Sequence, residues 1–168
     1  MAIADTLKTR DRFVELIEGV IDTEYTMSIC CRRLSLLIKN GRARKKFYDI
    51  SEVAKRNENL LMRRLSNLGV ADFILKNKCK FCKVNPESFS TLGALELGME
   101  IVSIAIRFYR ALLKYADTKE DIKLFNDLLT EKVQEKKFLK KEKGFRHADK
   151  VMFNSIRQFC IPEGYGKR

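Results

Sequence analysis

The segment FYDISEVAKRN at residues 47–57 returns as FNDLLTEKVQE at residues 125–135, an offset of 78 positions. Both segments begin with phenylalanine and place apolar residues three or four positions apart, as one face of an α-helix requires. The same offset pairs Leu34 with Leu112 and Leu61 with Leu139 outside the two segments. Each half of the chain is therefore predicted to form one helical hairpin, and two hairpins make a four-helix bundle.

Apolar periodicity and helix breakers predict five helices within a single domain that spans residues 1–168. The predicted helices cover residues 6–39, 43–67, 91–116, 118–143 and 145–159. Asn40 and Gly41 separate the first two helices, and Asp117 or Thr118 caps the fourth. Periodicity fails between Leu68 and Ser90, which predicts a long crossover between the hairpins. The expected fold class is all-α, a four-helix bundle plus a short C-terminal helix.

Two choices of interior face compete in the fourth helix. One face uses Phe125, Leu128, Lys132, Glu135 and Leu139, and the other uses Ile122, Leu129 and Val133. The 78-residue repeat favours the first, because it aligns that face with the apolar face of the second helix. This choice places a lysine and a glutamate inside the bundle.

Four charged or polar residues fall on the predicted interior faces, namely Glu24, Asn57, Lys132 and Glu135. An isolated buried charge costs several kcal/mol, so these residues are expected to pair with one another. Lys132 is the expected cation between Glu24 and Glu135. Tyr25, Tyr48 and Tyr109 are predicted to lie nearby, where a buried ring can donate a hydrogen bond to an internal carboxylate.

Residues 47–57, the segment AIRFY at residues 105–109 and the pair Leu124-Phe125 resemble the ferritin-like superfamily, in particular the rubrerythrin-type bundle. The resemblance covers about residues 13–139 and implies a ferritin-like fold with an ancestry in iron or oxygen chemistry. It places the di-iron ligand positions on Glu24, Ala54, Asn57, Val102, Lys132 and Glu135. Most ligands have thus been replaced in a vestigial metal-site cluster, in which Glu24 and Glu135 are the two remaining carboxylates for iron or another divalent metal.

A second candidate site involves cysteine. Cys79 and Cys82 have the spacing of half a zinc site, and Cys160 with the single histidine, His147, would complete a set of three cysteines and one histidine. Zinc at these cysteines and two reduced, solvent-facing thiols are both open interpretations of the pair.

Charge and composition bear on partners and location. The chain has 34 lysines and arginines against 22 acidic residues, a net charge of +12, which favours nonspecific attraction to polyanions such as nucleic acid. No apolar run approaches the ~20 residues that span a bilayer. Residues 1–12 are polar, and the five cysteines are an odd number. A cytoplasmic protein without a membrane segment is expected.

Three functional hypotheses follow. The first is a noncatalytic assembly or interaction module that has no intact di-iron site and no cofactor and that forms a homodimer or binds another protein. The second is an iron-binding oxidoreductase or iron-handling protein with a rearranged metal site. The third is nonspecific polyanion binding through the basic surface. The sequence favours a protein that is not an enzyme.

Overall fold

A computed structural model describes residues 2–70, 73–75 and 90–144 of the chain. The described residues form four α-helices, α1 (Ala2–Leu37), α2 (Gly41–Asn67), α3 (Thr91–Leu112) and α4 (Lys119–Gly144), and contain no strand. The predicted helix at 145–159 lies outside the described residues, as does most of the predicted crossover.

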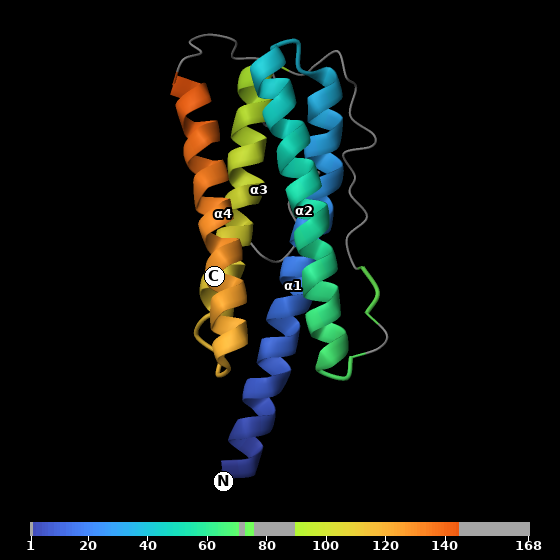
Figure 1. Cartoon of the computed structure of the whole chain (residues 1–168), viewed down its shortest axis with the longest axis vertical. Coiled ribbons are helices and arrows are strands. Elements are labelled where there is room, and N and C mark those ends of the chain that lie inside the picture. Colours follow the sequence, from blue (N-terminus) through green and yellow to red (C-terminus); the bar gives the residue numbers. More distant parts are fainter. Residues whose placement is uncertain (1, 71–72, 76–89, 145–168) are drawn as a thin grey trace.

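The four helices pack side by side as two antiparallel hairpins (Figure 1). α1 packs against α2, and α3 packs against α4, while α1 and α3 join the hairpins. α2 and α3 run in the same direction, so α2 ends and α3 begins at opposite ends of the bundle (Figure 1). The predicted all-α bundle of two hairpins is confirmed.

The turn between α1 and α2 has the predicted length but lies two residues earlier in the chain. α1 ends at Leu37 instead of residue 39, and α2 begins at Gly41 instead of residue 43. The reason is that Asn40 has an extended backbone (φ −72, ψ 115) and its side chain accepts a hydrogen bond from Ala43 N at 2.9 Å. Asn40 is therefore the N-cap of α2. At its other end α1 begins at Ala2 instead of residue 6, since residues 2–5 contain no glycine or proline.

The turn between α3 and α4 also differs from the prediction. α3 ends at Leu112, four residues before the predicted 116, because the following turn tightens: Lys114 N donates to Ala111 O, three residues earlier, at 3.0 Å. Thr118 caps α4, since its hydroxyl accepts from Asp121 N at 3.1 Å. α4 accordingly spans 119–144, one residue later at each end than the predicted 118–143.

The 78-residue repeat describes the core. The paired positions in both halves are at most 5% exposed: Leu34 and Leu112, Phe47 and Phe125, Ile50 and Leu128, Ala54 and Lys132, Asn57 and Glu135, and Leu61 and Leu139. In α4 the face favoured by the repeat is buried, whereas Ile122 of the competing face is 41% exposed. The predicted interior face of α4 is confirmed.

Two glycines allow the helices to approach closely. A Cβ atom on Gly19 of α1 would lie 2.5 Å from Phe108 Cε1 of α3, and one on Gly98 of α3 would lie 2.7 Å from Phe47 Cε1 of α2. Each distance is too short for a real contact, so a phenylalanine ring fills the space that a side chain at the glycine would need. The two rings thereby pack directly on a neighbouring helix backbone.

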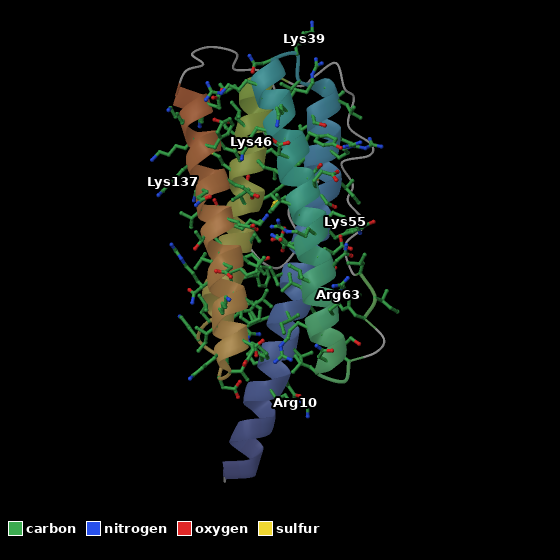
Figure 2. All side chains as sticks on the ribbon, in the orientation of Figure 1. Arg10, Lys39, Lys46, Lys55, Arg63 and Lys137 are labelled. Atoms are coloured by element: carbon green, nitrogen blue, oxygen red, sulfur yellow. The ribbon has the colours of Figure 1, made fainter. Side chains whose placement is uncertain are left out.

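A largely buried ion pair joins the ends of two helices, and exposed cations lie on the outside of the bundle. Arg64, in the last turn of α2, donates two hydrogen bonds to Asp121, in the first turn of α4, at 2.5 and 2.6 Å. Each charge also complements the dipole of its own helix. Basic side chains such as Arg10 and Lys39 lie at opposite ends of the bundle (Figure 2).

Across the described residues, none of the helices is apolar over a stretch sufficient to cross a membrane.

Candidate interior charge cluster

Three charged side chains from two helices meet inside the bundle. Glu24 comes from α1, and Lys132 and Glu135 come from adjacent turns of α4; they are 0%, 0% and 5% exposed. Lys132 Nζ lies 3.1 Å from Glu24 Oε2 and 3.1 Å from Glu135 Oε2. The ion pairs expected from the sequence are present, and one ammonium lies within reach of both carboxylates.

The helix positions explain this geometry. Lys132 and Glu135 are three residues apart in α4, so they share one face of the helix. Glu24 lies across the bundle on α1, and the four-carbon stem of Lys132 spans the gap. The contact with Glu24 Oε2 is an ion pair that lacks hydrogen-bond alignment, whereas Lys132 donates a hydrogen bond to Glu135 Oε2.

Two further side chains surround the charges. The hydroxyl of Tyr109, from α3, donates a hydrogen bond to Glu24 Oε1 at 2.7 Å, and the tyrosine is 0% exposed. Met27, one turn after Glu24 on α1, places its thioether sulfur 3.5 Å from Lys132 Nζ. Both carboxylates and the ammonium therefore sit in a largely apolar interior with few polar partners.

The sequence predicts that Asn57 of α2 joins the charged residues, and a hydrogen bond from its side chain does oppose the rise in the pKa of Glu24. Asn57 is 0% exposed, but its amide Nδ2 donates to Glu131 Oε2 of α4 at 3.3 Å, and its Oδ1 accepts from Arg56. Asn57 thus belongs to a network that links α2 with α4. Ala54 and Val102 are fully buried and offer only apolar surface.

Burial is the largest single influence on the pKa of each titratable group in the cluster. It raises the pKa of Glu24, opposed by the charge of Lys132 and the hydrogen bond from Tyr109. Burial also raises the pKa of Glu135 from 4.5 to about 7, against the opposing charge of Lys132. Desolvation disfavours the ammonium of Lys132, but the two carboxylates outweigh this effect and raise its pKa. The pKa of Tyr109 rises well above 10, first through burial and then through the charge of Glu24.

The raised pKa of Glu135 predicts a pH dependence of stability. Between 4.5 and about 7 the folded protein keeps a proton that the unfolded chain releases. The stabilisation is therefore complete below pH 4.5 and is lost as the pH rises through about 7. It amounts to up to about 3 kcal/mol.

Urea unfolding of the wild type and of Glu135→Gln, measured from pH 5 to pH 8, tests this expectation. The wild type should lose more stability than the variant as the pH rises, because glutamine does not titrate. Comparing the two proteins removes the pH response of all other groups. Parallel stability curves would show that Glu135 is already ionised at pH 5.

Two groups of predicted residues remain, the other tyrosines and the cysteine site. Tyr48 is 42% exposed and stacks under the guanidinium of Arg32 at 4.2 Å, so it lies on the surface and not at the cluster; Tyr25 is partly buried. The sequence did not indicate that Met27 contacts Lys132 or that Glu131 bonds to Asn57, since a methionine on an apolar face and a glutamate beside one are ordinary core and surface residues. The candidate cysteine site of Cys79, Cys82, His147 and Cys160 lies outside the described residues.

Comparison with known structures agrees with this architecture. The fold is similar to that of bacterioferritin from Rhodobacter capsulatus, with a TM-score of 0.65 over 92% of this chain and 96% of that chain. The two sequences are 17% identical, so the similarity establishes the fold. No protein-family model matches the chain, and no curated protein matches its sequence. The protein has the ferritin-like four-helix-bundle fold.

Proposed function

We propose that this protein is a ferritin-like bundle without a working di-iron centre and that it acts as a noncatalytic assembly or interaction module. The observation that supports this most strongly is the position of Lys132 Nζ, 3.1 Å from each of two buried carboxylates. An ammonium held there supplies the positive charge that Glu24 and Glu135 need, and it repels a divalent cation at the same place.

The donor set of the interior does not fit a di-iron centre. Such a centre takes a Glu from each of two helices and a Glu-x-x-His pair from each of the other two. On the resemblance to rubrerythrin-type bundles, Ala54 and Val102 stand at two glutamate positions, and neither side chain has a donor atom. Asn57 and Glu135 stand at the histidine positions. Among the described residues, no group of three or more histidine, cysteine or acidic side chains is arranged to hold a metal ion.

A second candidate function is iron binding or oxidoreductase chemistry at a rearranged site. Its support is that Glu24 and Glu135 both approach one point in the interior, where a single ion with water ligands would replace the ammonium if Lys132 moved away. The similar bacterioferritin is described with a metal-free dinuclear site and haem iron, which are properties of that protein. Binding a metal here would require removing a paired ammonium, so we rank this candidate second.

Metal analysis of the folded protein separates the two candidates. Protein purified without chelator and exposed to ferrous iron in air is expected to remain a folded helical bundle that retains well under one iron per chain. The measurement is elemental analysis after gel filtration, together with oxygen uptake. Two irons per chain with oxygen-dependent turnover would refute the noncatalytic proposal.

A further inference from the structure

A groove of about 730 Å³ runs along the outer side of the α3–α4 hairpin, away from the charge cluster. Its apolar part is formed by Met99 and Ile106 of α3. Arg107 and Arg110 of α3 line the groove toward one end, and Lys136 of α4 lies opposite them. The groove is largely open, and these three basic side chains are exposed.

The charges in this groove are unevenly neutralised. Toward the N-terminal end of α3, Glu96 forms an ion pair with Lys143 of α4 at 2.5 Å. Toward the C-terminal end, no ion pair joins Arg107, Arg110 or Lys136 to any carboxylate within residues 2–70, 73–75 and 90–144. The groove therefore has one end where the charges are paired and one end with three available cations.

The available cations are arranged to receive acidic groups. Arg107 and Arg110 are three residues apart, so their guanidinium groups project from the same face of α3. A guanidinium binds a carboxylate through two parallel hydrogen bonds, and Lys136 supplies a third positive charge from the facing helix. Beside them lies the partly buried side chain of Met99, whose exposed apolar surface would be covered by an apolar side chain of the same ligand, whereas Ile106 is only 6% exposed.

The shape of the groove indicates the size of the ligand. Binding sites for small molecules usually enclose most of the ligand surface, and an open groove does not. From Glu96 to Arg110 the helix rises by about 21 Å, the length of a helical segment of about 14 residues. An amphipathic helix laid in such a groove places its apolar face on the helix pair and its acidic residues over the cations.

The geometry points to a docking surface for an acidic, amphipathic helical segment of a partner protein. The carboxylates of the segment pair with Arg107, Arg110 and Lys136, and its apolar side chains cover Met99. This inference rests on the proposed function as an interaction module and assigns that module its surface. Nucleic acid is the less suitable ligand, because a polyphosphate chain would leave the apolar side chain of Met99 uncovered.

The distribution of other cations supplies a matched control. Arg63 on α2 and Lys123 on α4 are exposed and lie outside the groove, and Figure 2 shows Arg63 projecting from the opposite hairpin. Arg63→Glu/Lys123→Glu changes the net charge by the same amount as Arg107→Glu/Arg110→Glu. A general attraction of the basic protein to anions would respond equally to both double variants.

The test uses the full chain and a fluorescein-labelled synthetic peptide of about 14 residues that carries leucines on one helical face and glutamates on the other. Fluorescence anisotropy should show that Arg107→Glu/Arg110→Glu weakens binding by about tenfold or more, while the control variant changes it less than about twofold. Met99→Gln, which leaves all charges in place, should also weaken binding. Circular dichroism confirms that every variant is folded.

Three outcomes would overturn the docking surface. They are no binding of the peptide by the folded wild type, equal weakening in the two double variants, and undiminished binding of a peptide whose leucines are replaced by serines. The last two would identify general polyanion attraction instead, and single-stranded RNA would then lose affinity equally with both double variants. These results are independent of metal content, so the docking surface can fail while the noncatalytic proposal stands.

Discussion

Replacing Lys132 with alanine is expected to lower the free energy of unfolding by about 3–5 kcal/mol, because it leaves two buried carboxylates without their cation. Glu24 is fully buried and Glu135 is 5% exposed, so bulk water solvates neither carboxylate well in the folded bundle. Urea denaturation followed by circular dichroism measures the loss. Lys137→Ala, at an exposed position in the same helix, should change stability by less than about 0.5 kcal/mol.

A companion variant separates charge from volume. Lys132→Met keeps most of the side-chain volume and therefore creates little cavity, yet it removes the ammonium. If the loss is electrostatic, Lys132→Met should be destabilised nearly as much as Lys132→Ala. A methionine variant as stable as the wild type would mean that Lys132 contributes through packing alone.

Restoring the ligand pattern is expected to create divalent-metal binding at the interior cluster. The variant combines Ala54→Glu, Asn57→His, Val102→Glu, Lys132→Glu and Glu135→His. All five positions are at most 5% exposed, so the new side chains would face the interior beside Glu24. With the ammonium gone and four carboxylates and two histidines in place, the set matches that of di-metal bundles.

Calorimetric titration with Mn²⁺ or Co²⁺ measures this gain, with two ions per chain as the expected stoichiometry. The matched control adds Glu24→Ala to the restored variant and should weaken binding. A restored variant that is folded and binds no metal would show that these interior positions are not placed as they are in a di-metal bundle.

Much of the fold follows from the repeat, for a physical reason. Each helix has to bury one apolar face, and two hairpins of the same design bury equivalent positions. The offset of 78 therefore identified the interior face of α4, even though Ile122 offered an alternative that the structure leaves 41% exposed. The same logic placed Lys132 inside the bundle, because its repeat partner Ala54 lies on an unambiguous apolar face.

The details of the cluster were harder to predict, because they depend on the direction of long side chains. The position of Asn57 on an interior face did not reveal that its amide bonds to Glu131 on the neighbouring helix. Tyr48 is close in sequence to interior residues, but Arg32 holds its ring at the surface. Helix ends shifted where a cap or a tight turn outweighed periodicity, as at Asn40 and after Leu112.

The α3–α4 groove is a feature that periodicity could not indicate. Arg107 lies within the segment AIRFY that carries the family resemblance, and in the sequence it is one of many basic residues. That Arg107 forms no ion pair with a carboxylate of the described residues can be seen only when α3 and α4 are placed side by side. The similarity to bacterioferritin persists in the fold at 17% sequence identity, since many different apolar sequences fill the same bundle.

The central claim is that Lys132 is the counter-ion of the two interior carboxylates, and a mutant cycle tests it most directly. The stabilities of Lys132→Met, of Glu24→Gln/Glu135→Gln and of the triple variant are compared with that of the wild type. We predict that the triple variant recovers most of the stability lost in Lys132→Met, because its interior no longer contains an unpaired charge. Losses that simply add, within about 0.5 kcal/mol, would contradict the account.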